Sequence, residues 1–419
     1  MISRKGHKTG YLKAIKEVNT EMKRLLFIAL SVILMSTFIS VDCSASPKTL
    51  KIGFLAALTG FLSTKDIPDV NMATAAAEVL NKKGGITVQG QQYMIKFIFE
   101  DYKTSMDGIT SATNRLVYDH SVKFIIGPTA FFSSGAGPIT DPAKVIRVIT
   151  FACNTPGELD ATTPYCFLGS NGSIGKFMGS LKYLRKAYPD IEKVAIVMPD
   201  DGTIKFLLPL YQTALAAEGL TLVDKPILYP NQMQDFSPIV VKINALKEAD
   251  AICHTNGVSQ QIGAIVKGIR ESGNFKPYAG MMCATMNDIV AVAGLEASKD
   301  VFMASTSADE PDLPPLGKEV IQRYIAKHGK ETSLILYAAN CLYMLKQAIE
   351  GAQSLDTDAV KTYWESMDAI DTLEGPGIMC GDKTYGISHH AVAHPQPIQI
   401  LDKDNNAVSG GLMDIGTIP

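Results

Sequence analysis

The sequence lacks the motifs of the common nucleotide-binding, hydrolytic and metal-dependent sites. None of its 419 residues falls in a G-x-S-x-G, H-E-x-x-H or Cys-x-x-Cys pattern, so neither a hydrolase nucleophile nor a zinc site of these kinds is indicated. Gly135-Ala136-Gly137 lacks the third glycine of a dinucleotide-binding turn. Gly175-Lys176 is followed by Phe177, where a phosphate-binding loop requires Ser or Thr. We therefore expect no catalytic residues, no metal and no cofactor.

Histidine is also scarce, with seven residues in the chain. The densest group is His389, His390 and His394. On a strand, His390 and His394 would share a face but stand too far apart to hold one ion without a third element. We interpret the group as part of a solvated surface.

Charged side chains make up only 19% of the sequence, with 39 basic and 42 acidic residues. Residues 1–45 hold seven of the basic and three of the acidic ones, so the remainder carries 32 and 39, a net charge of −7. Proteins that bind nucleic acid gather an excess of positive charge, so we expect no nucleic-acid partner.

Seven cysteines are present, and six of them follow residue 45. In an exported protein an even number permits disulfides, but six thiols allow fifteen complete pairings and the sequence does not choose among them. Buried free thiols are the alternative. The six are Cys153, Cys166, Cys253, Cys283, Cys341 and Cys380.

The N-terminal region follows the order of a secretory signal peptide, which is basic, then apolar, then rich in small residues. Met22-Lys23-Arg24 precedes an apolar run over 25–41, and Ala45 is a suitable last residue before cleavage. A membrane anchor is one alternative, although the run is slightly shorter than the roughly 18 residues of a spanning helix. A lipid-modified Cys43 is another, but the preceding residues resemble a lipoprotein box poorly. We predict that residues 1–45 are a signal peptide with a misassigned start and that the mature chain is exported to the periplasm.

Short apolar runs alternate with helical patterns after this region, which predicts an α/β fold with parallel sheets covered by helices. The chain is longer than one core usually supports, so we expect two lobes. Strand-like sequence returns at 387–401 after a helical stretch at 302–353, which indicates that the chain goes back to a lobe it had left. The expected strands are 50–55, 93–99, 122–126, 145–149, 194–198, 221–226, 249–253 and 278–281, and the clearest helices are 70–80, 108–118 and 134–143.

Two loops, 127–135 and 150–156, follow expected strands and are rich in small, hydroxyl and amide side chains. The first opens a helix, where free N–H groups and the hydroxyls of Ser133 and Ser134 would converge at the positive end of the helix dipole. Such a site suits a carboxylate, although ordinary helix capping by either serine explains the same pattern. Ligands of open α/β sheets bind beyond the carboxyl ends of strands, and both loops lie at such ends.

Six short segments of the chain stand in an order and spacing that resemble the type I periplasmic binding proteins, in particular the branched-chain amino-acid and organic-acid family of ABC transporters. The resemblance extends over essentially the whole chain from Thr49 onward. The segments are 52–60, 80–86, 99–101, 124–128, 235–237 and 337–339.

The resemblance implies two Rossmann-like lobes joined by a three-segment hinge near Ser170, Ser305 and Cys380. Lobe I is expected to hold the ligand in the open state, and lobe II to close over it. The expected boundaries are 46–170 and 305–380 for lobe I, and 171–304 and 381–419 for lobe II.

Carried over by position, the resemblance also implies a set of ligand-binding residues. Those of lobe I would hold a carboxylate, and Phe131 and Phe132 would add an apolar surface unless they belong to the core. Lys65 would add a cation, although we interpret it as a solvated loop lysine. The set is Thr129, Ala130, Phe131, Phe132, Ser133, Ser134, Ala152, Cys153, Asn154 and Thr155 in lobe I, and Asp201, Thr203, Asn256, Val258 and Met282 in lobe II.

Amino-acid binders of this family carry an acid where this chain has Met282. A buried ammonium without a counter-charge is costly, so we expect a small carboxylate with an apolar or aromatic body, delivered to the membrane permease of an ABC importer. Three alternatives stay open. They are a branched-chain or other neutral amino acid paired with Asp201, a receptor domain of a signalling system that senses an acid or amide, and, third, an enzyme.

Overall fold

The computed structural model describes residues 18, 20–24, 46–281, 284–329 and 334–418. The chain divides into two compact units, Met1–Ser46 and Pro47–Pro419. The apolar run of the expected signal peptide lies outside the described residues. Among the helices of the described part, none is long and apolar enough to cross a membrane.

A six-stranded sheet, in the order β2-β3-β1-β4-β5-β6, forms the base of the first lobe. All neighbouring strands are parallel except β2 and β3. The strands are β1 (Lys48–Ala56), β2 (Ile86–Val88), β3 (Gln91–Asp101), β4 (Phe124–Ile126), β5 (Ile146–Ile149) and β6 (Cys166–Leu168).

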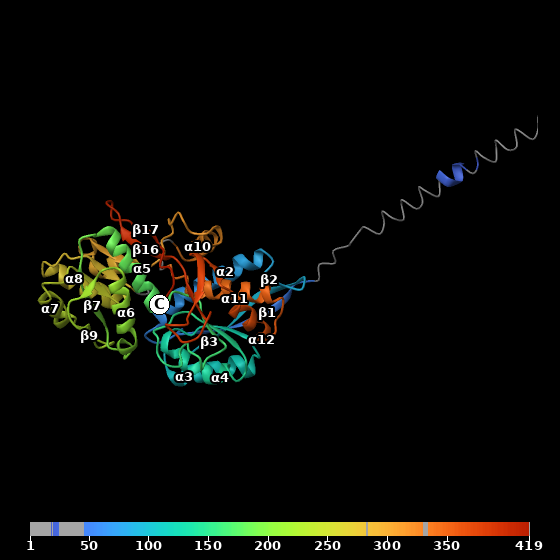
Figure 1. The fold of residues 1–419 in the computed structure, drawn as a ribbon, viewed down its shortest axis with the longest axis horizontal. Helices are drawn as coiled ribbons and strands as arrows, with labels where there is room; N and C mark the ends of the chain where they lie inside the picture. Colours follow the sequence, from blue (N-terminus) through green and yellow to red (C-terminus); the bar gives the residue numbers. More distant parts are fainter. Residues whose placement is uncertain (1–17, 19, 25–45, 282–283, 330–333, 419) are drawn as a thin grey trace, which may run out of the picture. The chain divides into compact units, whose positions relative to one another are not determined.

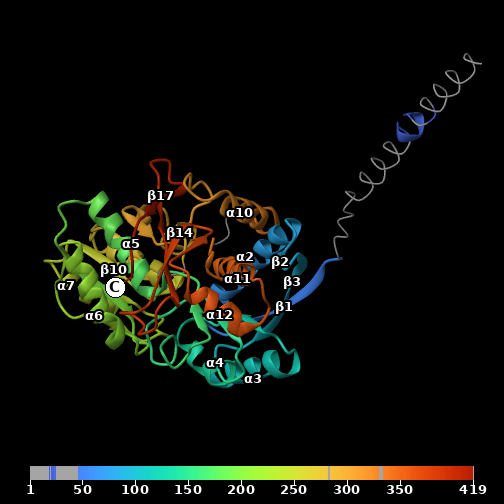
Figure 2. The same cartoon turned by 45° about the vertical axis from the view of Figure 1, so that its right-hand side comes forward.

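Helices cover both faces of this sheet because successive strand residues point to opposite sides. Phe54 packs in one core with residues of α2 (Ser63–Lys82) and α11 (Tyr337–Ala352). Leu55 packs in another with residues of α3 (Met106–Asn114) and α4 (Ser133–Thr140). Figures 1 and 2 show α3 and α4 on one side of the sheet and α2 and α11 on the other. The remaining helices of this group are α10 (Pro315–His328) and α12 (Thr357–Glu365).

An eight-stranded sheet forms the base of the second lobe, in the order β17-β16-β12-β11-β10-β7-β8, with β9 also paired to β7. One core lies against α5 and α6, and another against α7, α8 and α9. The strands are β7 (Lys193–Pro199), β8 (Thr221–Leu222), β9 (Ile227–Tyr229), β10 (Ala251–His254), β11 (Tyr278–Gly280), β12 (Val301–Met303), β16 (Gln396–Leu401) and β17 (Ala407–Met413). The helices are α5 (Gly172–Ala187), α6 (Ile204–Ala217), α7 (Ser237–Ala245), α8 (Ser259–Glu271) and α9 (Met286–Ala293).

The chain passes between the two sheets three times. The passages lie between β6 and α5, after β12, and between β15 (Ala391–Ala393) and β16. β15 belongs to a small antiparallel sheet with β13 (Ala369–Thr372) and β14 (Gly375–Cys380). The fold is thus the expected two-lobed α/β arrangement, while the boundaries at residues 170, 304 and 380 stay predictions.

Some local expectations differ from the structure. The strand expected at 221–226 is only the two residues of β8, and β9 was not foreseen. The helical stretch expected at 302–353 opens in strand β12. The interpretation of the histidines as a solvated surface is wrong for His390 and His394, which are 0% and 4% exposed.

No disulfide joins the cysteines of the described part to one another. Burial raises the pKa of Cys253 to about 12 and that of Cys380 to about 11, so these two stay protonated at neutral pH. Cys283 lies outside the described residues. These cysteines are Cys153, Cys166, Cys253, Cys341 and Cys380, all buried.

Candidate ligand-binding site

A cavity of about 280 Å³ lies at the carboxyl ends of strands from both lobes. This is where ligand sites form in open α/β sheets, and its volume is near the lower limit of roughly 300 Å³ that is typical of small-molecule sites. The lining residues are Phe61, Leu62, Lys65, Thr129, Ala130, Phe151 and Cys153 from the first lobe, and Asp201, Asn231, Gln232, Asn256, Gly257, Val258 and Gln261 from the second.

The first-lobe wall contains a buried ion cluster around Lys65. Its ammonium lies 3.1 Å from Asp66 Oδ1 and 3.3 Å from Asp69 Oδ2. It also donates to the hydroxyls of Thr129 and Thr150, each at 3.3 Å. Lys65 is 5% exposed, so the interpretation as a solvated lysine is wrong.

Backbone and phenol donors anchor the two aspartates of this cluster. Ala338 N donates to Asp69 Oδ1 at 2.8 Å, and Asp66 Oδ2 accepts from Ala57 N at 2.8 Å and from the Tyr102 hydroxyl at 2.9 Å. Burial raises the pKa of Asp69 to about 6, although Lys65 opposes the shift. Above this pH the cluster holds two carboxylates against one ammonium.

A further buried carboxylate, that of Glu158, holds the loop after β5. Its oxygens accept from Cys153 N at 2.9 Å, from Thr155 N at 2.8 Å and from the Thr155 hydroxyl at 3.0 Å. Burial raises the pKa of Glu158 to about 7, and the hydrogen bonds oppose that shift. The N–H groups of Cys153 and Thr155, which we expected to face a ligand, therefore bind a carboxylate of the protein itself.

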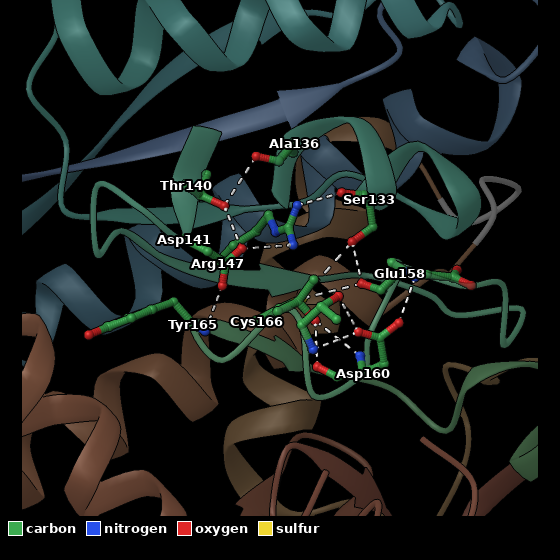
Figure 3. Close-up of polar contacts among 12 residues, drawn as sticks. Ser133, Ala136, Thr140, Asp141, Arg147, Glu158, Asp160, Tyr165 and Cys166 are labelled. Atoms are coloured by element: carbon green, nitrogen blue, oxygen red, sulfur yellow. Dashed lines mark hydrogen bonds and ion pairs between the residues drawn. The ribbon is translucent and has the colours of Figure 1, made fainter. Parts of the chain in front are cut away.

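Ser133 is hydrogen-bonded to the backbone of Glu158 and to the side chain of Arg147 (Figure 3). Its hydroxyl donates to the Glu158 carbonyl at 2.6 Å, and its own carbonyl accepts from Arg147 Nη1 at 2.6 Å. Arg147 is fully buried, with Nη2 3.9 Å from Asp141 Oδ2. This arrangement stabilises the start of α4 beneath the cavity.

The second-lobe wall brings three of the expected residues together. Asp201 Oδ1 accepts from the Thr203 hydroxyl at 2.6 Å and from Thr203 N at 2.9 Å. That hydroxyl accepts from Asn256 Nδ2 at 3.1 Å, and Asn256 Oδ1 accepts from the Ser173 hydroxyl at 3.2 Å. Asp201 thus presents a carboxylate to the cavity on a side chain of fixed orientation.

Two of the lining residues adopt left-handed backbone conformations without being glycine. Ala130 has φ 49° and Asn256 has φ 56°. Asparagine tolerates this region, whereas alanine does so at a steric cost of roughly 1–3 kcal/mol that the surrounding structure must offset. Such residues cluster at ligand clamps, which agrees with the position of both loops at the cavity.

The structure brings only part of the expected set to the cavity. Thr129, Ala130, Cys153, Asp201, Asn256 and Val258 line it. Phe132 is 2% exposed and packs on the Tyr102 ring at 5.0 Å, in the core rather than in the cavity. Met282 and the side chain of Phe131 lie outside the described part of the chain. The other expected residues, none of them among the described lining residues, are Ser133, Ser134, Ala152, Asn154, Thr155 and Thr203.

Sequence reasoning missed several lining residues. Phe61 and Leu62 follow the first strand, and the rule that placed the loops after β4 and β5 applies equally to them. Asn231 and Gln232 follow β9, which the sequence did not reveal. Gln261 lies three residues into α8, where only its tertiary contacts turn it to the cavity.

Comparison with known proteins indicates a single protein family. Residues 49–403 match the model of a family described as "Periplasmic binding protein". Leu/Ile/Val-binding protein homolog 3 of Brucella melitensis is 27% identical over 321 residues, which are 75% of this chain and 83% of that protein.

Solved structures share the fold. The substrate-binding protein of a branched-chain amino acid transporter from Streptococcus pneumoniae, in complex with isoleucine, has a TM-score of 0.67 and 19% identity, covering 87% of this chain and 99% of its own. A solute-binding protein of an ABC transporter from Rhodopseudomonas palustris, in complex with 3,4-dihydroxybenzoic acid, has a TM-score of 0.67 and 19% identity, covering 88% and 99%.

Proposed function

The chain belongs to the periplasmic binding protein family, and from this we propose that it is the extracytoplasmic solute-binding component of an ABC importer. It captures a small carboxylate with an apolar or aromatic body and releases it unchanged to the permease. The observation that carries this proposal is the cavity at the strand ends of both lobes. The isoleucine and dihydroxybenzoate complexes of proteins with this fold support the ligand class.

The cavity offers different chemistry at its two walls. Phe61, Leu62 and Phe151 give the first-lobe wall an apolar surface for the body of the ligand. The Thr129 hydroxyl lies on the same wall and accepts from Lys65, so its own O–H is suited to donate to a carboxylate oxygen. Lys65 adds its positive charge to this wall, while its N–H groups bind protein acceptors.

Asp201 favours a second candidate, a neutral amino acid. Its carboxylate lines the cavity on the wall opposite Lys65, where a ligand ammonium would find a counter-charge. Asp66, Asp69 and Asp201 also outnumber the charge of Lys65, which disfavours a ligand with only negative charge.

Titration calorimetry with leucine and with 4-methyl-2-oxopentanoate, its deaminated counterpart, separates the candidates. If the ligand is an acid, Asp201→Asn leaves binding of the oxo acid unchanged or improves it, because a repelling charge is removed. If it is an amino acid, Asp201→Asn weakens leucine binding by about tenfold or more, because a buried ammonium loses its partner. Asp200→Asn is the matched control, since Asp200 is exposed and does not line the cavity.

Capture by either route predicts a stability change that is independent of the transporter. A ligand that binds only the folded chain raises its apparent stability in proportion to the logarithm of ligand concentration. Failure of every acid and amino acid to raise the melting temperature would contradict the proposal. Transport and sensing are separated by adding the loaded protein to a reconstituted permease and measuring ATP hydrolysis.

A further inference from the structure

A chain of buried hydrogen bonds runs from the second-lobe core to the cavity through His254. The His254 ring is fully buried at the end of β10. Its Nδ1 lies 2.6 Å from the Tyr278 hydroxyl and its Nε2 lies 2.7 Å from the Tyr229 hydroxyl. The Tyr229 hydroxyl in turn donates to Oε1 of Gln261, a lining residue, at 3.1 Å. We call these four side chains the His254 relay.

The chemistry of the donors fixes the direction of every bond in the relay. Val258 N–H also points at Gln261 Oε1, at 3.1 Å, so this atom is the amide oxygen and accepts from both Val258 N and Tyr229. Tyr229 has then used its proton and must accept from His254 Nε2–H. His254 Nδ1 is left as an acceptor for the Tyr278 hydroxyl. Burial lowers the pKa of His254 to about 3, which keeps the ring neutral.

The same bonds decide which group of the Gln261 amide is available to a ligand. The oxygen is held by Tyr229 and Val258, and the nitrogen donates one of its two N–H groups to Asn231 O at 2.8 Å. A rotation of the amide by 180° would set its nitrogen against the Val258 N–H and its oxygen against the Asn231 carbonyl, so these two backbone groups fix the orientation. The remaining N–H belongs to a side chain at the cavity wall.

Resting on the proposed function, we propose that Gln261 is a specificity-determining residue that presents a hydrogen-bond donor to the end of the ligand remote from Lys65. The preferred ligand is then a small acid or amino acid whose far end carries an acceptor, such as a hydroxyl or carbonyl oxygen, rather than a purely apolar one. Tyr229 and His254 are positioning residues, because they act on the ligand only through Gln261.

Matched ligand pairs test the proposal by titration calorimetry on the full chain. The pairs are benzoate with 4-hydroxybenzoate, and leucine with asparagine, which is close to leucine in shape. The wild type should prefer the polar member of the pair it binds by about tenfold, since an apolar group would leave the Gln261 donor unpaired. Gln261→Met should abolish this preference. Gln260→Met is the control, because Gln260 is exposed on the same helix and outside the cavity lining.

Tyr229→Phe tests the positioning role without touching the cavity lining. It should reduce the preference severalfold while affinity for the apolar member of the pair changes little, whereas a merely structural defect would weaken both members equally. The variant also serves if Gln261→Met does not fold.

The possible outcomes distinguish failure of the inference about Gln261 from failure of the proposed solute-binding function. A wild type that binds the apolar member more tightly, or a Gln261→Met or Tyr229→Phe variant with an unchanged preference, overturns the inference and leaves the proposed function standing. A wild type that binds no member of either pair, with no shift in melting temperature, overturns both.

Discussion

The two walls of the cavity are supported by different kinds of interaction, buried ion pairs and charged hydrogen bonds in the first lobe and neutral hydrogen bonds in the second. Beneath the first-lobe wall, buried charges hold the loops: Lys65 with its aspartates, and Glu158 with the loop after β5. Beneath the second-lobe wall, the neutral His254 relay holds the side chain of Gln261 in place. Burial raises the pKa of Glu158 to about 7 and lowers that of His254 to about 3.

In the folded state the groups beneath the first-lobe wall change charge near neutral pH, whereas the relay beneath the second-lobe wall does not. Glu158 changes its charge close to pH 7, whereas His254 stays neutral throughout the range in which the unfolded chain's histidines titrate, near pH 6.5. We therefore expect protonation of Glu158 to stabilise the first lobe as the pH falls, and Gln261 to keep one orientation. Four variants test this contrast.

Lys65→Met should have the largest effect, because it leaves two buried aspartates without their cation. Removing one partner of a buried ion pair typically costs about 3–5 kcal/mol of the free energy of unfolding. Urea unfolding measures the loss through the fluorescence of Trp364, the one tryptophan of the chain, which is buried against Phe167. The loss should be smaller at pH 5 than at pH 8, since Asp69 is then protonated. A cost below 1 kcal/mol would show that water or a neighbour replaces the ammonium.

Glu158→Gln should remove a pH dependence from the wild type. The folded state binds this proton more tightly than the unfolded state, so the contribution is fully present below about pH 4.5 and is lost as the pH rises through about 7. Wild-type stability should therefore increase by roughly 2–3 kcal/mol from this group alone between pH 8 and pH 4.5. The difference between wild type and Glu158→Gln, measured by urea unfolding across this range, isolates it. A pH-independent difference would contradict the raised pKa.

Tyr229→Phe should have a smaller effect that does not depend on pH between 7 and 9. It leaves the His254 Nε2–H without a partner, and an unsatisfied buried donor costs about 1–3 kcal/mol. The same unfolding experiment at pH 7 and pH 9 measures it. A cost that varied strongly with pH would mean that His254 or its neighbours change charge, which would remove the contrast between the walls.

Lys299→Met should have the smallest effect on stability, and it is the control for Lys65→Met. Lys299 pairs with Glu296 at 2.7 Å, but the two side chains are 54% and 83% exposed. Exposed pairs contribute about 0–1 kcal/mol because water and salt screen them. If this variant lost as much stability as Lys65→Met, burial would not be the reason for the strength of the first-lobe cluster.

Part of the fold and of the cavity lining can be predicted from the sequence. The alternation of apolar runs and helical patterns predicts the α/β fold, because strand and helix periodicities are local. Thr129, Ala130, Cys153, Asp201, Asn256 and Val258, which the resemblance implied as ligand-binding residues, line the cavity, and their role in binding stays a prediction. Loops that follow parallel strands meet at one edge of a sheet, so sequence position alone brings such residues together.

Only the tertiary structure decided which polar groups line the cavity and which are bound by other groups of the protein. The Glu158 carboxylate accepts hydrogen bonds from N–H groups of the loop that we had expected to bind a ligand. Lys65 becomes buried through partners 64 and 85 residues away in Thr129 and Thr150, and Gln261 is oriented by Tyr229, 32 residues before it. Sequence patterns report the period of one segment, whereas these pairings depend on how separate segments pack and on the cost of leaving a buried polar group without a partner.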